Sequence, residues 1–189
     1  KAITNYNYMR KLEVSELNRI DKYSFIESKK LPVVVVLDNV RSLHNVGSVF
    51  RTSDAFRINE IYLCGITATP DNSLTEIHKT ALGAEDSVKW EYYSNTIDVV
   101  EKLKMEGYTI VSVEQVEQSI KLDEFKADSS KHYALILGNE VKGVQQEVVD
   151  ISDISLEIPQ YGTKHSLNVS VSAGIVLWEF AKQLKNMLD

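Results

Sequence analysis

Polar side chains that could do chemistry gather in three loops, each next to an apolar run. The first, HNVGSVFR, holds Asn45 and Arg51. An arginine beside a site presents several N–H donors to a phosphate or a substrate hydroxyl. The simpler explanation is structural: Asn45 caps a helix, and Arg51 pairs with Asp54 or Asp38. The loop alone leaves both interpretations open.

The second loop, LGNEVKG, follows an apolar run that ends at Leu137. Gly138 permits unusual backbone angles and the close approach of a ligand. Asn139 and Glu140 add an amide and a carboxylate at the same place. The simpler explanation is a tight turn whose polar side chains bond their own backbone. Taken by itself, the loop favours that explanation.

The third loop, IPQYGTKHSLN, joins a strand-like run to a long apolar segment. Pro159 stiffens its start, and Gly162 permits a sharp turn. Ser166 and Asn168 lie where the free N–H groups of a helix start can bind an anion. Helix capping by Ser166 would account for one of these polar residues and leave Asn168 unexplained.

The elements that must position these loops alternate along the chain. Residues 33–36 are four consecutive valines, which is typical of a strand buried on both faces. The patterning predicts strands at 33–38, 60–65, 87–93, 108–113, 132–138 and 154–159, and helices at 44–56, 74–82, 95–107, 144–152 and 167–187. This alternation predicts an α/β fold with a mostly parallel sheet flanked by helices. In such sheets ligands bind beyond the carboxyl ends of the strands, where the three loops lie.

The length of 189 residues suits one domain with a short extension. Residues 1–30 are polar with scattered apolar positions, and they predict one or two short helices that pack on something else. We therefore expect a short N-terminal helical extension at 1–30 and a single domain at 31–189.

Several classes of protein are disfavoured by the composition. No apolar run is long enough to span a bilayer and no signal peptide is evident, so we expect a cytoplasmic protein without a membrane partner. Cys64 is the only cysteine, which rules out an internal disulfide, and the four histidines are scattered, so no metal site is expected. The chain also lacks the glycine fingerprints of dinucleotide-binding and P-loop folds.

The three loops together resemble the SpoU (TrmH) family of RNA ribose 2′-O-methyltransferases, within the SPOUT class. The first family motif is similar to HNVGSVFRTSDAF, the second to LILGNEVKGV and the third to IPQYGTKHSLNVSVSAGIVLWE. The resemblance covers residues 33–180, and three motifs in this order and spacing are very specific. The departures are SLHN, where many members carry a proline before the Asn, and the variable TKH at 163–165. Neither touches a residue with an assigned role.

The resemblance implies a deep trefoil knot in the C-terminal part of the α/β domain, a feature that pattern alone does not predict. It implies that the knot binds S-adenosyl-L-methionine, and that the family works as a homodimer with the last helix in the interface. The residues it implies for cofactor binding are Val113, Glu114, Leu137, Gly138, Asn139, Ile158, Pro159, Ser166 and Leu167.

The resemblance also assigns the catalytic set Arg51, Asn45, Glu140, Ser166 and Asn168. In the family the arginine activates the 2′-hydroxyl. Because the pKa of arginine is far above neutrality, we interpret Arg51 as positioning the hydroxyl and stabilising the developing alkoxide before acting as a base. Asn45 would orient Arg51 or the ribose, and Glu140 would fix the second loop. Ser166 and Asn168 would bond RNA, cofactor or partner subunit.

The leading hypothesis is ribose 2′-O-methylation of RNA, with tRNA favoured because no extra N-terminal RNA-binding domain is evident. The alternatives are an rRNA-directed enzyme of the same family and a knotted RNA-binding protein without catalysis. The net charge of −6 argues against binding RNA by bulk charge. We hypothesise that positive potential is focused around the site by Arg41, Arg51, Arg57, Lys142 and Lys164.

Overall fold

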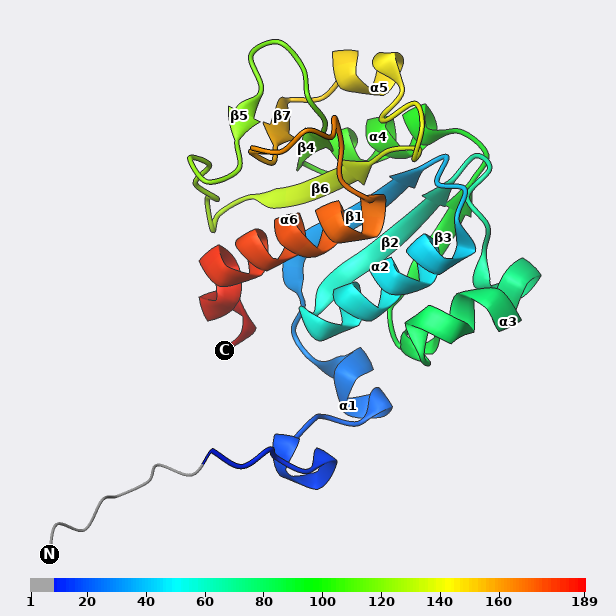
Figure 1. Cartoon of the computed structure of the whole chain (residues 1–189), viewed down its shortest axis with the longest axis vertical. Coiled ribbons are helices and arrows are strands. Elements are labelled where there is room, and N and C mark those ends of the chain that lie inside the picture. Colours follow the sequence, from blue (N-terminus) through cyan, green and yellow to red (C-terminus); the bar gives the residue numbers. More distant parts are fainter. Residues whose placement is uncertain (1–8) are drawn as a thin grey trace, which may run out of the picture.

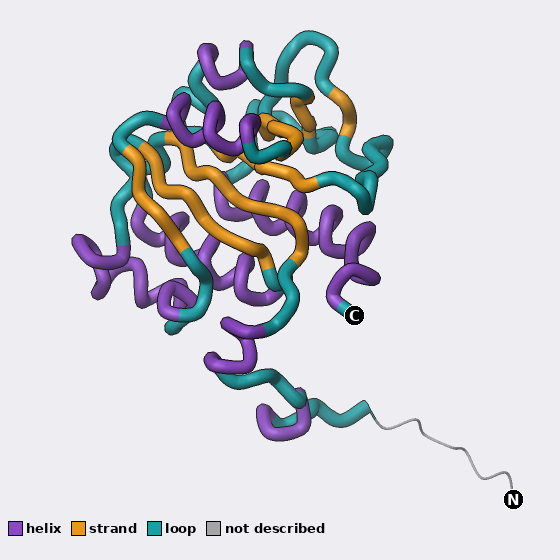
Figure 2. The backbone as a smooth tube through the Cα atoms, turned by 180° about the vertical axis from the view of Figure 1, so that it is seen from behind, coloured by secondary structure: helices purple, strands orange, loops and turns teal. Residues whose placement is uncertain are grey.

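The parallel sheet expected from the sequence is present in the computed structural model, which describes residues 9–189. Within these residues seven strands lie in the order β3-β2-β1-β6-β4-β7-β5, and every neighbouring pair is parallel (Figures 1 and 2). The strands are β1 (Leu31–Asp38), β2 (Ile58–Cys64), β3 (Trp90–Tyr93), β4 (Tyr108–Val113), β5 (Ile120–Lys121), β6 (His132–Leu137) and β7 (Ile154–Glu157).

Helices cover both faces of the sheet, as the alternating pattern predicted. One face is covered by α2 (Leu43–Ala55) and α6 (Val169–Leu184), with α3 (Pro70–Ala81) packed beside α2 (Figure 1). The other face carries α4 (Thr96–Met105) and α5 (Gln146–Asp150). None of the helices in residues 9–189 is long and apolar enough to cross a membrane.

The central strand β1 shows why its valine run has no polar alternation. Val33 and Val35 pack into the core beneath α2 and α6, whereas Val34 and Val36 pack into the core beneath α4. All four side chains are fully buried. The prediction of a strand buried on both faces is confirmed. The strand ends at a polar residue, Asp38.

One strand and several element boundaries differ from the prediction. Strand β5 was not predicted, because a two-residue strand has no periodicity of its own and forms only by pairing with β7. Helix α3 begins at Pro70, since proline is well suited to a first helical turn. Helix α6 begins at Val169, two residues later than predicted.

The described part of the N-terminal extension projects from the body of the protein (Figures 1 and 2). It contains a 3₁₀ helix at Val14–Leu17 and the short helix α1 at Lys22–Glu27. Phe25 is buried, whereas the other large apolar side chains here are exposed: Met9, Leu12, Val14, Leu17, Ile20, Tyr23 and Ile26. Residues 1–8 of the predicted extension lie outside the described residues.

Helices α2 and α3 approach closely at Gly47, in the first of the three motifs. A Cβ added at this position would lie 2.3 Å from the carbonyl oxygen of Ile77 and 2.1 Å from the hydroxyl of Thr80. Because the carbonyl oxygen belongs to the backbone of α3, rotating a side chain does not relieve the first clash. Gly47 therefore fixes the distance between α3 and the helix that carries Asn45 and Arg51.

We predict that Gly47→Ala lowers the free energy of unfolding by about 1–3 kcal/mol, because α3 must shift to admit the methyl group. Urea denaturation measures this change. Ser48→Ala on the same helix is the control, since it adds no Cβ atom, and it should have little effect. Equal stability of the Gly47 variant and the wild type would contradict the close packing of these helices.

Candidate functional site

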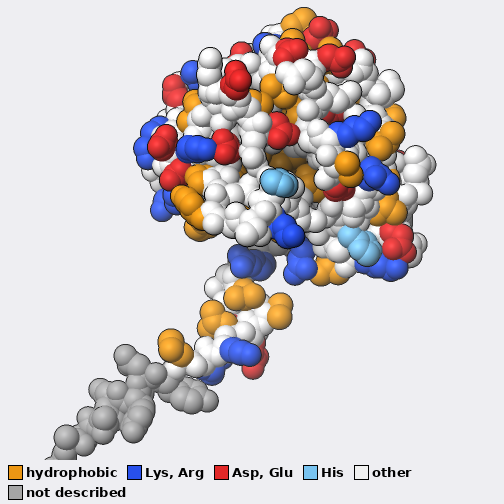
Figure 3. Space-filling view, turned by 45° about the horizontal axis from the view of Figure 1, so that its top comes forward, with side chains coloured by type: hydrophobic (Ala, Val, Ile, Leu, Met, Phe, Trp, Pro, Cys, Tyr) orange, Lys and Arg blue, Asp and Glu red, His pale blue; other side chains and the backbone are white. Residues whose placement is uncertain are grey.

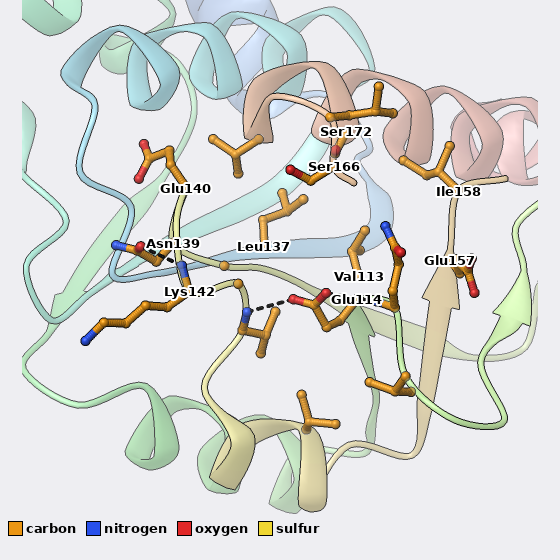
Figure 4. A pocket seen from close by; sticks show the side chains of 18 of the residues that line it. Val113, Glu114, Leu137, Asn139, Glu140, Lys142, Glu157, Ile158, Ser166 and Ser172 are labelled. Atoms are coloured by element: carbon orange, nitrogen blue, oxygen red, sulfur yellow. Dashed lines mark hydrogen bonds between the residues drawn. The ribbon is translucent and has the colours of Figure 1, made fainter. Parts of the chain in front are cut away.

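A cavity of about 500 Å³ opens at the carboxyl edge of the sheet, where the loops after β4, β6 and β7 meet (Figure 4). Segments that are far apart in the sequence form its walls, namely 113–116, 137–144 and 156–158 together with 165–167. This is the edge at which ligands bind in parallel α/β sheets. Nearly all the residues proposed for cofactor binding line the cavity: Val113, Glu114, Leu137, Gly138, Asn139, Ile158, Ser166 and Leu167.

The walls of this pocket combine apolar and charged side chains. Val113, Leu137 and Leu167 contribute apolar surface, while Glu114, Glu140, Glu157, Lys142 and His165 contribute titratable groups. Among the described residues, no group of three or more His, Cys, Asp or Glu could hold a metal ion. The pocket therefore suits an organic ligand with both apolar and polar parts.

The loop between β6 and α5 is folded tightly on itself. Asn139 and Gly143 exchange two backbone hydrogen bonds, of 3.0 and 2.9 Å. A Cβ on Gly138 would lie 2.1 Å from the backbone of Gly143 and Val144, and Gly143 has a left-handed φ of 68°. A close approach does occur at Gly138, but the approaching group is the loop's own backbone, whereas the prediction was the approach of a ligand.

The side chain of Asn139 is used to build this turn. Its Oδ1 accepts hydrogen bonds from the backbone N–H groups of Val141, at 2.9 Å, and Lys142, at 3.1 Å. Its Nδ2 donates to the backbone oxygen of Asn39 at 2.7 Å. The simpler explanation, a polar side chain that hydrogen-bonds the backbone of its own turn, is therefore correct for Asn139.

Glu114 fastens the same loop to the end of β4. Its Oε2 accepts the backbone N–H of Val144 at 3.0 Å, which Figure 4 draws as a dashed line. The next residue, Gln115, donates from Nε2 to the backbone oxygen of His165 at 2.8 Å. Glu114 and Gln115 therefore connect all three walls of the pocket.

Glu140 links the pocket to the start of α2. Its carboxylate accepts hydrogen bonds from the backbone N–H groups of Arg41 and Ser42, both at 2.9 Å, and from the Asn45 amide at 3.0 Å. Burial acts to raise the pKa of Glu140, but these three hydrogen bonds outweigh it and hold the pKa below its usual range. The structure thus brings together two predicted catalytic residues, Asn45 and Glu140, that are 95 positions apart.

The capping predictions at two helices are wrong in detail. Ser42 caps α2 by accepting the N–H of Asn45, which is itself buried within the first turn. Asn168 caps α6 by accepting the N–H groups of Ser170 and Val171. Ser166, which the capping explanation had assigned to this role, instead lines the pocket. Asn168 is left outside the pocket lining.

Arg51 lies on the exposed surface of α2 and does not line the pocket. No hydrogen bond or ion pair joins its guanidinium to any residue within 9–189. The two suggested partners are engaged elsewhere, since Asp54 accepts the Ser87 hydroxyl at 2.8 Å and Asp38 is buried among other donors. The ion-pair explanation for Arg51 is therefore wrong.

Several residues of the site had no sequence signal that singled them out. Gln146 and Val149 line the pocket from α5, and Gln115 and His165 line it from two loops. Gln115, Gln146 and Val149 belong to no recognisable motif, and His165 lies in the variable TKH of the third motif, so only the fold reveals them. Asp38 was considered only as a partner for Arg51, although its place at the end of a buried strand is a signal that could have marked it.

The fold and pocket define a class, that of a parallel α/β domain with a ligand site at its carboxyl edge. The family follows from comparison: residues 32–178 match the model of the SpoU rRNA Methylase family, and the chain belongs to this family. It is 33% identical over 164 residues to a tRNA (guanosine(18)-2′-O)-methyltransferase of Aquifex aeolicus, covering 84% of this chain and 72% of that protein.

Two solved structures support the same assignment. A TrmH/SpoU tRNA modifying enzyme of A. aeolicus has a TM-score of 0.77 at 31% identity, over 88% of this chain and 83% of that one. An AdoMet-bound rRNA methyltransferase of Sinorhizobium meliloti has a TM-score of 0.73 at 29% identity. That match covers 84% of this chain and 62% of the S. meliloti chain.

We predict that Glu140→Gln destabilises the protein at neutral pH, because one of the two acceptor oxygens becomes an N–H₂ donor facing a backbone N–H. The pKa of Glu140 is lower in the folded protein than in the unfolded chain. The carboxylate therefore contributes its full stabilisation of the fold at pH values above the pKa of the unfolded chain, about 4.3. That contribution is lost as the pH falls through the folded value. Urea denaturation across pH 7 to about 3 should show the variant and wild type converging in acid. A difference that is constant with pH would contradict this account.

Proposed function

We propose that this protein transfers a methyl group from S-adenosyl-L-methionine to a ribose 2′-hydroxyl in RNA, with tRNA as the favoured substrate. The observation that carries the proposal is the shared pocket. Except for Pro159, all the residues of the second and third motifs that were assigned to the cofactor line this pocket. The named activity of the A. aeolicus relative supports tRNA. The S. meliloti structure supports the alternative, an rRNA substrate.

The pocket residues fit S-adenosyl-L-methionine, which supplies the methyl group and its own leaving group. Val113, Leu137 and Leu167 offer apolar walls for the adenine ring. The carboxylate of Glu114 lies in the same lining and complements the positive charges of the sulfonium and amino groups, whereas that of Glu157 is paired with Lys121 at 2.7 Å. With the cofactor providing the leaving group, the chain's own residues have to orient the hydroxyl and remove its proton.

In our proposal Arg51 orients the 2′-hydroxyl and stabilises the developing oxyanion. Its lack of a partner among residues 9–189 leaves its N–H donors available for RNA. Arg51 lies six residues beyond Asn45 on α2, roughly 9 Å along the helix axis. The Glu140–Asn45 hydrogen bond therefore fixes the helix that presents Arg51 relative to the pocket. Ser166, in the pocket lining, would contact RNA or cofactor, and Asn168 would hold the start of α6.

The hypothesis of a five-residue basic patch is wrong for Arg57. That residue directly precedes β2 and its backbone oxygen accepts the N–H of Leu31, so it lies at the amino edge, opposite the pocket. Lys142 lines the pocket and Arg41 lies beside Glu140. Basic and acidic side chains are interspersed on the face shown in Figure 3. We propose that RNA is held by a few local cations near the pocket.

We further propose that the C-terminal segment forms the trefoil knot of the SPOUT class and that the chain acts as a homodimer in the cytoplasm. The knot is supported by the match of residues 32–178 to the SpoU family, because the family resemblance is what implies it. The dimer is supported by exposed apolar side chains along one side of α6, at Val171, Ile175 and Trp178. Spacings of four and three residues place them on one face of the helix. The extension at 1–30 and the domain at 31–189 remain our proposed division of the chain.

We predict that Arg51→Ala lowers methyl transfer by about 100-fold or more while leaving the Kd for S-adenosyl-L-methionine unchanged. The assay incubates the protein with cofactor and separated tRNA and rRNA fractions, and quantifies 2′-O-methyl nucleosides by mass spectrometry. Lys131→Ala is the charge-matched control, because Lys131 is exposed at the amino edge of β6. No methylated nucleoside with wild-type protein would refute the proposed activity, and full activity in Arg51→Ala would refute the role of that arginine.

We predict that Val171→Asp combined with Ile175→Asp converts a dimer into a monomer, because two carboxylates would be buried in the interface. Light scattering after gel filtration gives the molar mass. Met105→Asp provides the control, since Met105 is 84% exposed at the end of α4, away from α6. A wild-type monomer, or a double variant that stays dimeric, would contradict the proposed interface.

A further inference from the structure

A fully buried carboxylate, Asp38, lies at the carboxyl end of β1 and holds the exit of the pocket loop. Its Oδ2 accepts the backbone N–H of Gln145 at 2.8 Å, and its Oδ1 accepts the Gln145 side-chain amide at 2.6 Å. Gln145 follows Val144 directly and stands immediately before α5. Both the backbone and the side chain of one residue are thus held by one carboxylate.

The other donors to Asp38 come from outside the pocket loop. The Thr96 hydroxyl donates to Oδ1 at 2.6 Å from the start of α4, and the Asn39 amide donates to the same oxygen at 3.0 Å. Asp38 has no exposed surface. A carboxylate in this position is tolerated only when donors replace its lost hydration. Four hydrogen bonds do so, and two of them come from Gln145.

Segment 38–42 also holds the entrance of the pocket loop. The backbone oxygen of Asn39 accepts the amide of Asn139, and the backbone N–H groups of Arg41 and Ser42 donate to Glu140. The loop is therefore fastened at both ends to the short segment between β1 and α2. Since Gln146 and Val149 line the pocket from α5, moving Gln145 would also move that wall.

We propose that Asp38, acting through Gln145, is a positioning residue that sets the shape of the cofactor pocket and thereby its affinity. The inference rests on the proposed function, because it takes S-adenosyl-L-methionine as the ligand of this pocket. Asp38 touches neither the pocket space nor the reacting atoms. Its effect is on cofactor binding, whereas Arg51 acts on the transfer step.

The test is calorimetric titration of the full chain with S-adenosyl-L-methionine. Gln145→Ala removes the side-chain hydrogen bond and should raise the Kd about tenfold. Gln145→Glu places a second carboxylate against Asp38 and should raise it further. At saturating cofactor, the kcat of Gln145→Ala should stay within about twofold of wild type, because a positioning defect in the pocket is relieved once the cofactor is bound.

Thr96→Val is the matched control. It removes a hydrogen bond of the same length that reaches the same Asp38 oxygen from α4, and with it only a long contact of 3.5 Å from the Gln145 amide to the Thr96 hydroxyl. It should lower the melting temperature and leave the Kd within about twofold of wild type. Wild-type affinity in Gln145→Ala would overturn the inference. Equal weakening by Thr96→Val would also overturn it, because the effect would then be a general loss of packing.

Hydrogen exchange of the protein without cofactor separates this inference from the proposed function. Amides of residues 138–145 should exchange faster in Gln145→Ala than in wild type, and should be unchanged in Thr96→Val. If wild-type protein fails to bind S-adenosyl-L-methionine, the proposed function fails, while the exchange rates still judge whether Asp38 positions the loop. Unchanged exchange in Gln145→Ala would refute the positioning role by itself.

Discussion

The site depends on carboxylates that accept backbone N–H groups where no helix or strand does. Residues 138–145 form a loop with a single internal bridge, so several of its amides need other acceptors. Glu114 accepts from Val144 and Asp38 accepts from Gln145. Glu140 projects from the same loop and accepts from the segment before α2. Because a carboxylate bonds N–H donors more strongly than a neutral group does, these contacts hold irregular backbone in one shape.

The shape of the site therefore depends on three other parts of the fold at once. The pocket loop cannot move without disturbing the end of β4, the end of β1 and the start of α2. Gly138 and Gly143 are needed because the loop passes so close to itself and to Glu114 that a Cβ would collide. The hydrogen bonds of Glu140 to the start of α2 also fix the helix that bears Arg51 relative to the pocket. The structure thus couples the pocket to an arginine that lies outside it.

The sequence predicted the layout well because most of its signals are local. A run of valines predicts a central strand, and alternating elements predict a parallel sheet and the edge where ligands bind. One failure was local, because Ser42, three residues before Asn45, is the cap of α2. Other failures depended on contacts between distant residues, such as the hydrogen bond of Asn45 to Glu140, 95 positions away. The two-residue strand β5 exists only through its pairing with β7, and no spacing in the sequence reports Asp38 beside Gln145.

The acidic composition also has a structural explanation. A net charge of −6 suggests repulsion of RNA if all acids face solvent. Several do not: Asp38, Glu60 and Glu85 are buried, and Glu114 and Glu140 are half-buried acceptors. N–H and hydroxyl donors replace the lost hydration of Asp38, Glu114 and Glu140, and Glu60 is paired with Lys89 at 2.9 Å. Arg51, exposed and without a partner in residues 9–189, keeps its charge available. Asp38, Glu114 and Glu140 thus serve as hydrogen-bond acceptors that build the site, while the exposed guanidinium of Arg51 stays available to an anionic ligand.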